Sequence, residues 1–417
     1  MARIVVASAA YLGDVAPFVE PANRLADRGH DVTFVAPAGF HDLLAGERFS
    51  LATYPVDFSA RAMHADPVHQ RLMRHPFLNQ ARLGRYWVRA SLGADAAAAG
   101  DALAEAVSGA DAVVSHATFA SLTAPVAAAA GVPLVVGQLF PMMMPTAAWT
   151  PPLRVRNRNL GRRANRWAWR ALAEASGRLM CDRELNEVRR AHGAAPLRGA
   201  ALLSWTAATR TVVLLSRHYA GADPGDWDGV TWGGFARWDG PSARPPDPAV
   251  DAYVAAGDAP VLVCLGTSAA TGASRAFARI ADDLARDGLR SLLLVGDAAN
   301  LPGLDGREGA FEFAPVTRVL PSCRVAVVSG ALGTLAAALA AGVPVVVLPQ
   351  LFDQPWHGAR AEDLGVGVMV RRPRQVAAAV ARIEADPSYR ERALDLAARL
   401  ATEDGAGALA DAVESVL

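Results

Sequence analysis

The sequence contains no lysine. All 41 basic residues among its 417 are arginines, and 41 acidic residues balance them, so the formal net charge is zero. A protein dedicated to nucleic acid usually carries a basic excess, which this chain lacks. Since alanine is also abundant, we attribute the missing lysine to a GC-rich genome rather than to function.

Cysteine is scarce, and long apolar runs are missing. Cys181, Cys264 and Cys323 do not have the spacing of metal ligands, which predicts no metal site and fits a reducing compartment. The opening stretch, MARIVVASAA, is too short for a signal peptide. No apolar run approaches the roughly 20 residues that a membrane span needs. We therefore expect a soluble, cytoplasmic protein without a transmembrane segment.

What the sequence does contain is enough chain for two domains. At 417 residues, of which 52% are hydrophobic, it can form two full cores. It opens with a buried strand, a helix and a second strand, which predicts a Rossmann-like parallel sheet, although G-x-G-x-x-G is absent there. A later segment rich in Asp, Gly, Trp and Pro marks a linker. Two domains are therefore predicted, over 1–215 and 246–403, joined by a linker over 216–245.

The rest of the chain is organised around residues 326–354. A valine-rich strand is followed by a turn, SGALGT at 329–334, an Ala/Leu-rich helix and a second apolar strand. The backbone N–H groups that open such a helix lack partners and favour an anion such as a phosphate. Asp353 and Gln354, just past the second strand, suit the hydroxyl groups of an attached sugar. The alternative is that the glycines only allow tight packing in a parallel sheet.

Four motifs in order resemble the nucleotide-binding half of the GT-B glycosyltransferases: SGALGT, AGVP at 341–344, DQP at 353–355 and LGVG at 364–367. The resemblance extends over most of the chain and is closest to the bacterial natural-product and sterol-type enzymes of family 1. It implies an α/β fold of two Rossmann-like parallel-sheet domains with an interdomain cleft. The first domain would bind the acceptor and the second the nucleotide sugar. A C-terminal helix at 404–417 would pack back on the first domain.

The resemblance implies a donor site with two departures from the family. Ser329 stands where relatives usually have a histidine that reaches the donor phosphate, so a charged contact is lost. Ala338 stands where plant members have a ribose-binding glutamate. The donor-binding residues are expected to be Gly266, Thr267, Val316, Ser329, Gly330, Gly333, Thr334, Asp353 and Gln354.

The resemblance also implies a base for the acceptor, within GDVAP at 13–17. Relatives have His or Asp at the position of Asp14, which is expected to take the acceptor proton; alternatively, Asp14 only caps the next helix. His116 ends a predicted strand, where many relatives have the aspartate that orients a histidine base. We hypothesise a reversed dyad, in which His116 orients Asp14 or itself takes the proton. A histidine that is merely hydrogen-bonded at a strand end is the other interpretation.

Two further segments carry residues of interest. Phe140, Met142 and Met143 in a Pro-bounded loop are expected to form an adaptable apolar wall for the acceptor, although ordinary core packing explains each of them as well. The basic segment 154–170, with Trp167 and Trp169, fits either contact with anionic lipid or a solvated face that covers its tryptophans.

The predicted activity is the inverting transfer of a sugar from an NDP-sugar, UDP- or TDP-linked, to a lipophilic small-molecule acceptor in secondary metabolism. We expect no metal, no cofactor besides the nucleotide-sugar co-substrate, no nucleic-acid partner, and a monomer or homodimer. Two alternatives stay open. One is an NDP-sugar epimerase of the same fold, which needs no acceptor pocket. The other is a non-catalytic GT-B-like auxiliary protein that has lost donor binding.

Overall fold

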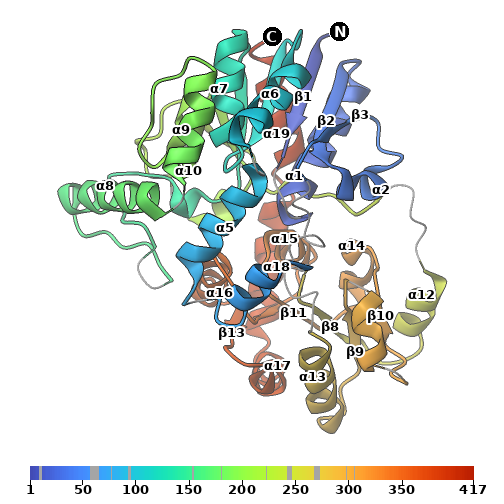
Figure 1. The fold of residues 1–417 in the computed structure, drawn as a ribbon. Coiled ribbons are helices and arrows are strands. Elements are labelled where there is room, and N and C mark those ends of the chain that lie inside the picture. Colours follow the sequence, from blue (N-terminus) through green and yellow to red (C-terminus); the bar gives the residue numbers. More distant parts are fainter. Residues whose placement is uncertain are drawn as a thin grey trace. The chain divides into compact units, whose positions relative to one another are not determined.

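The computed structural model describes residues 1–8, 12–56, 65–76, 78–92, 95–152, 155–179, 181–221, 223–241, 247–266, 273–296, 298–304 and 306–417. Contacts within the chain divide it into two compact units, and Figure 1 labels many of their helices and strands. The first unit comprises Met1–Ala243 and Glu403–Leu417, and the second comprises Arg244–Thr402.

The first unit is built on a seven-stranded parallel sheet in the order β3-β2-β1-β4-β5-β6-β7. Its central strands are rich in valine and almost wholly buried, which is typical of a parallel sheet with helices on both faces. The strand order reverses between β1 and β4, and open α/β sheets bind ligands beyond the carboxyl ends of the strands at such a switch point. The strands are β1 (Arg3–Ala7), β2 (Asp31–Pro37), β3 (Ser50–Tyr54), β4 (Ala112–His116), β5 (Leu134–Gln138), β6 (Arg210–Val213) and β7 (Val230–Trp232).

Helices α6, α7 and α9 share one hydrophobic core with the sheet, in which Val5, Val113 and Val136 take part. The described helices of the first unit are α1 (Leu12–Asp27), α2 (His41–Leu44), α4 (Pro67–Met73), α5 (Gln80–Leu92), α6 (Ala96–Val107), α7 (Ala120–Ala130), α8 (Arg162–Leu179), α9 (Asp182–Ala191), α10 (Ala200–Leu203), α11 (Arg217–Ala220) and α19 (Gly405–Glu414). Three 3-10 turns accompany them: η1 (Ala38–Phe40), η2 (Pro141–Met143) and η3 (Ser204–Ala207).

The last helix of the chain, α19, completes the first unit by packing along α1. Leu409 of α19 is fully buried. Arg24 of α1 pairs with Asp404, and Arg28, just after α1, pairs with Asp411 at 2.7 Å. Exposed ion pairs of this kind contribute little each, so the burial of apolar side chains holds α19 in place and the charges orient it.

The second unit contains a six-stranded parallel sheet in the order β10-β9-β8-β11-β12-β13, whose switch point lies between β8 and β11. Its strands are β8 (Val261–Cys264), β9 (Ser291–Leu294), β10 (Ala310–Phe311), β11 (Val325–Val328), β12 (Val345–Val347) and β13 (Gly367–Met369). Its described helices are α12 (Pro248–Ala255), α13 (Ser274–Arg286), α14 (Val316–Val319), α15 (Leu332–Ala340), α16 (Gln354–Asp363), α17 (Val376–Ala385) and α18 (Ser388–Leu400), with 3-10 turns η5 (Ala298–Leu304), η6 (Leu320–Ser322) and η7 (Pro373–Gln375).

The predicted α/β class, with two Rossmann-like parallel sheets, is confirmed by these two sheets. α1 begins at Leu12 and holds both Pro17 and Pro21 inside it, where local preference disfavours a helix. Buried packing of Val15 and Phe18 offsets the two backbone hydrogen bonds that the prolines cannot make. The segment 216–245, predicted as a linker, contains α11 and β7, and β7 pairs with β6 in the first sheet.

Among the described residues, no helix is both long and apolar enough to cross a membrane.

Leu409→Ala tests whether α19 is integral to the first unit. The side chain is fully buried, so its truncation should lower the free energy of unfolding by about 2–5 kcal/mol, as for other core leucines. Leu417→Ala is the control, because that side chain is 49% exposed and should change stability by less than about 0.5 kcal/mol. Denaturant unfolding of both variants measures this; equal stabilities would show that α19 is not part of the core.

Candidate active site

The first candidate site lies at the switch point of the first sheet. β1 and β4 are neighbours in register, with Ala7 opposite Ser115, so the two strands end side by side. Asp14 follows β1 as the third residue of α1, and His116 is the last residue of β4. The reversal of strand order therefore brings Asp14 and His116 together: Nε2 of His116 lies 3.5 Å from Oδ1 of Asp14.

His116 sits in an apolar enclosure. Its side chain is 0% exposed, and its ring has edge contacts with Phe18 of α1 and with Phe140 after β5, at centroid distances of 5.7 and 5.8 Å. Burial lowers the pKa of His116 to about 3. The imidazole is therefore neutral at any pH above about 4.

Thr118 determines which nitrogen of that neutral ring carries the proton. The backbone N–H of Thr118 donates to Nδ1 of His116 at 3.1 Å, and the Thr118 hydroxyl lies 2.7 Å from the same nitrogen. A backbone N–H can only donate, so Nδ1 is an acceptor and the proton sits on Nε2. This Nε2–H is buried and has no hydrogen-bond partner within normal length among the described residues. Its neighbour at 3.5 Å is the Asp14 carboxylate, which can accept it if the two close slightly.

Asp14 lies inside the first turn of α1, not before the helix where an N-cap stands, so the interpretation of Asp14 as a cap does not hold. Its backbone carbonyl accepts a hydrogen bond from the Ser8 hydroxyl at 2.6 Å, which ties the start of α1 to the end of β1. The carboxylate is 22% exposed, whereas its histidine neighbour is completely enclosed. The positive end of the helix dipole favours its charged form. Of the two side chains, only Asp14 is partly exposed, and a carboxylate is able to accept a proton.

Of the three residues expected on the acceptor wall, the structure brings Phe140 to the pair through its contact with His116. Met142 is 3% exposed and Met143 is half-buried, both within η2. Gly137 leaves room for Phe18, because a Cβ at that position would lie 2.5 Å from the Phe18 ring.

The second candidate site lies at the switch point of the second sheet. β8 and β11 are paired with Cys264 opposite Val328, so the segments after them begin side by side. Gly266 has φ +74°, and a Cβ there would lie 3.5 Å from the Ser329 hydroxyl. The two turns expected to flank a diphosphate are thus adjacent. Thr267, expected in the same site, lies outside the described residues.

The turn between β11 and α15 has the geometry of a helix-start anion site. Gly330 has φ +90°, in the left-handed region that favours glycine, and a Cβ there would lie 3.0 Å from the backbone oxygen of Gln354. No side chain caps the nine-residue helix α15. Gly333 in its first turn is exposed, and a Cβ there would meet nothing within 4 Å. The first-turn amides of α15 therefore have no side-chain cap, and Gly333 adds no side chain that would cover them.

Ser329 and Thr334 are less available than the amides. Ser329 is 1% exposed, and its hydroxyl accepts the backbone N–H of Ala331 at 3.3 Å. It therefore shapes the turn, in a place where a histidine would carry charge. Thr334 Oγ1 lies 3.8 Å from the Cys264 thiol across the switch point.

Asp353 and Gln354 divide into one accessible and one enclosed side chain. Asp353 precedes α16, is 19% exposed, and has Oδ2 3.2 Å from Nε2 of the buried His357. Gln354 is 3% exposed, and its Oε1 accepts the backbone N–H groups of Gln350 and Leu351 at 2.8 and 3.2 Å. Its carbonyl oxygen therefore holds the backbone after β12, and Asp353 is the better placed to meet a ligand.

Val316 is the first residue of α14, which packs on α15 beside this turn. Pro315 precedes it as the N-cap and supplies no N–H of its own. The backbone of Val316 is therefore close to the helix whose start forms the anion site.

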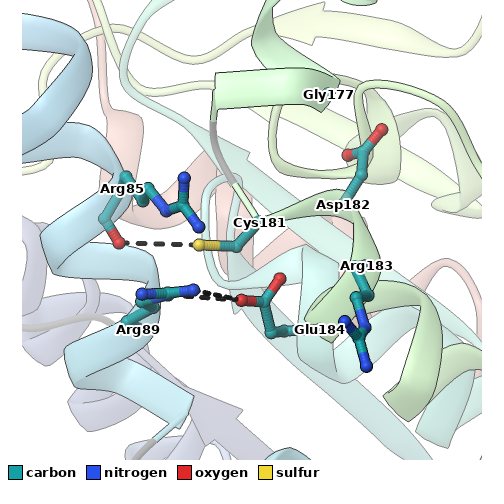
Figure 2. Close-up of a pocket in the computed structure, with 7 residues that line it drawn as sticks. All are labelled: Arg85, Arg89, Gly177, Cys181, Asp182, Arg183 and Glu184. Atoms are coloured by element: carbon teal, nitrogen blue, oxygen red, sulfur yellow. Dashed lines mark hydrogen bonds and ion pairs between the residues drawn. The ribbon is translucent and has the colours of Figure 1, made fainter.

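Among the described residues, no group of three or more His, Cys, Asp or Glu is arranged to hold a metal ion. A separate cavity of about 310 Å³ lies between α5 and α9, and Figure 2 shows its lining. Arg89 pairs there with Glu184 at 2.9 Å, and the Cys181 thiol donates to the Arg85 carbonyl oxygen at 3.6 Å. None of the expected site residues lines it.

Sequence reasoning missed Thr118, Phe18 and His357. His357 had a usable signal, because it lies four residues after Asp353, and residues at that spacing share a face of a helix. Phe18 had the weaker signal of an apolar residue one turn after Asp14. Thr118 had none, because its role rests on its backbone N–H, which any residue except proline supplies.

Comparisons with known proteins find relatives of the second unit and of nearly the whole chain. A family model described as erythromycin biosynthesis protein CIII-like, C-terminal domain, matches residues 297–415. O-mycaminosyltylonolide 6-deoxyallosyltransferase of Streptomyces fradiae is 30% identical over 417 residues, covering 97% of this chain and 94% of that protein.

Solved structures are similar along the same length. The calicheamicin glycosyltransferase CalG4 matches with a TM-score of 0.69 at 21% identity, covering 100% of this chain and 98% of that one. The spinosyn rhamnosyltransferase SpnG, solved with thymidine diphosphate, matches with a TM-score of 0.63 at 18% identity, covering 99% of this chain and 100% of that one. Similarity at these identities shows that the fold is shared.

Gly330→Val and Gly333→Val form a matched pair for the anion site. At Gly330 the left-handed backbone and the close Gln354 oxygen should make the variant less stable by at least about 1–3 kcal/mol. At Gly333 the side chain enters open space, so stability should change by less than about 1 kcal/mol while access to the first-turn amides is blocked.

Denaturant unfolding and the thermal shift with thymidine or uridine diphosphate measure the two effects. A bound nucleotide at 100 times its dissociation constant should stabilise the wild type by about 2.7 kcal/mol, and Gly333→Val should lose this. If Gly333→Val keeps the full thermal shift with nucleotide, the nucleotide does not bind at the start of α15.

His116→Gln tests the neutral, buried imidazole through pH. The pKa of His116 in the folded protein is about 3, below the unfolded value of about 6.5. Between these values the unfolded chain binds the extra proton, so stability rises with pH there and is lost as pH falls. From pH 4 to 6 the wild type should show a slope of unfolding free energy steeper than the variant by up to about 1.4 kcal/mol per pH unit. Parallel curves would mean that His116 titrates normally.

Proposed function

We propose a mechanism for this chain on one premise: it belongs to the GT-B glycosyltransferases of family 1. It transfers a sugar from a nucleoside diphosphate to a lipophilic small-molecule acceptor, as the names of its natural-product relatives indicate. The assignment of residues to steps is our proposal. The observation that carries it is the Asp14–His116 pair, in which only Asp14 can accept a proton.

Asp14 acts as the general base. As the acceptor oxygen forms its bond to the anomeric carbon, its hydroxyl proton passes to the Asp14 carboxylate, and the bond from that carbon to the diphosphate breaks with the electron pair leaving on the phosphate oxygen. One displacement of this kind inverts the anomeric carbon. The exposed fraction of Asp14 and its place at the switch point of the first sheet support this role.

His116 positions the base. Its Nδ1 is occupied by the Thr118 N–H, so Nε2 carries a proton and cannot take another from the acceptor. As a donor to Oδ1 of Asp14, it orients the carboxylate toward the acceptor. The rings of Phe18 and Phe140 keep water from the imidazole, and Phe140 contributes to the wall for a lipophilic acceptor.

The second unit binds the donor. The first-turn amides of α15 and the turn at Gly266 receive the diphosphate and stabilise its charge as it departs. Asp353 accepts hydrogen bonds from sugar hydroxyls, and His357 steadies its carboxylate. Because Ser329 supplies no positive charge, donor affinity rests on backbone amides and is expected to be modest. The donor is TDP- or UDP-linked; the thymidine diphosphate complex of SpnG favours the former.

The mechanism is tested by kinetics of three variants with one donor and acceptor pair. Asp14→Asn keeps the shape and removes the base, so kcat should fall by about 10²–10⁴. His116→Gln keeps a donor to the carboxylate and should lose much less. Thr118→Pro removes the N–H that fixes the tautomer and should resemble or exceed His116→Gln.

A matched control for Asp14→Asn is Asp27→Asn at the exposed end of the same helix, which should be fully active. If His116→Gln is as inactive as Asp14→Asn while both remain folded and bind nucleotide, His116 is the base and the assignment is reversed.

A further inference from the structure

The most basic stretch of the chain lies outside both candidate sites. Residues 155–173 contain six arginines and no Asp or Glu, in a chain whose total formal charge is zero. Most of this stretch belongs to α8, which extends outward from α9 and α10 in Figure 1. Such a concentration of one charge on one element points to a partner of the opposite charge.

One face of α8 fixes the helix to the first unit. Asn165 is 0% exposed, donates to the Ala147 carbonyl at 2.9 Å, and accepts the backbone N–H of Leu160 at 3.0 Å. Trp169, one turn later, is 3% exposed and donates its Nε1–H to the Trp149 carbonyl at 2.7 Å. These bonds leave α8 little freedom to roll and expose its other face permanently.

That outward face carries Arg163, Arg166, Trp167 and Arg170, at the i, i+3, i+4, i+7 spacing of a single helical stripe. All four side chains are exposed, and Trp167 is 71% exposed. The expectation that the face covers its tryptophans therefore holds for Trp169 and fails for Trp167. Trp167 therefore presents an indole ring to solvent, next to the guanidinium groups of the same helix face.

The arginines of the stripe have no acidic partner within the described part of the chain. The next acidic residue along α8, Glu174, is paired with Arg198 at 2.8 Å, so it does not neutralise them. Leu160, 58% exposed, adds an apolar side chain at the start of the helix. The surface thus offers three unpaired guanidinium groups around an indole ring.

We propose that this stripe of α8 docks the protein on an anionic lipid surface. Guanidinium groups bind lipid phosphates in pairs of hydrogen bonds, and an exposed indole settles at the boundary between head groups and acyl chains. A bilayer surface does not need a partner of complementary shape. It can bind guanidinium groups at its phosphates and an indole ring at the same depth, and the exposed stripe presents both. A lipophilic acceptor would concentrate at the same surface, although the inference does not depend on the proposed reaction.

Co-sedimentation of the full chain with vesicles tests the proposal. Wild type should bind phosphatidylglycerol/phosphatidylcholine vesicles, hardly bind pure phosphatidylcholine, and dissociate as salt is raised. Replacing the three stripe arginines together (R163Q, R166Q and R170Q) should weaken binding by at least about tenfold. Trp167→Phe should abolish a blue shift of tryptophan fluorescence on binding while leaving the fold intact.

The control removes the same charge elsewhere: Arg371, Arg372 and Arg374 are exposed in the second unit and become glutamine together. This variant should bind vesicles as wild type does. If both triple variants lose vesicle binding equally, binding depends on overall charge and not on the stripe, and the proposal is overturned. Absence of wild-type binding to anionic vesicles would also overturn it and leave the stripe to an acidic protein.

Discussion

One hydrogen bond organises the chemistry of the first unit: the backbone N–H of Thr118 donates to Nδ1 of His116. Because a backbone N–H can only donate, Nδ1 must be unprotonated. The ring proton therefore lies on Nε2, on the side of Asp14. Burial lowers the pKa of His116 to about 3 and keeps the ring neutral, so this arrangement holds at any pH above about 4. The pair then has one donor and one acceptor, so in the proposed mechanism the substrate proton passes to the carboxylate.

The two units place their candidate sites with the same structural feature, a reversal of strand order. In each, a parallel sheet reverses its strand order, and the segments after two neighbouring strands meet beyond their carboxyl ends. In the first unit these segments carry a carboxylate and an imidazole; in the second they carry glycines and uncapped helix amides. One switch point is thus suited to a proton and the other to an anion. Ser329 carries no charge, so the second depends on its backbone amides to meet an anion.

The sequence predicts the sheets well because buried parallel strands are runs of valine and leucine, and it predicts the helix-start turn because a left-handed position such as Gly330 needs glycine. It does not predict that α1 continues through Pro17 and Pro21, since tertiary packing overrides the local preference there. Nor does it reveal that the side-chain oxygen of Gln354 accepts a hydrogen bond from the backbone N–H of Gln350. The exposure of Trp167 beside the burial of Trp169 follows from how α8 docks, which no local pattern encodes.

The tautomer of His116 is the most direct test of the roles proposed for Asp14 and His116. Nitrogen-15 NMR of histidine-labelled protein, with His116→Gln used to assign the signal, distinguishes the two ring nitrogens. We predict an unprotonated Nδ1 and a protonated Nε2 throughout pH 5 to 8. A proton on Nδ1, or an imidazolium forming near neutral pH, would contradict it, because His116 would then be free to act as the base.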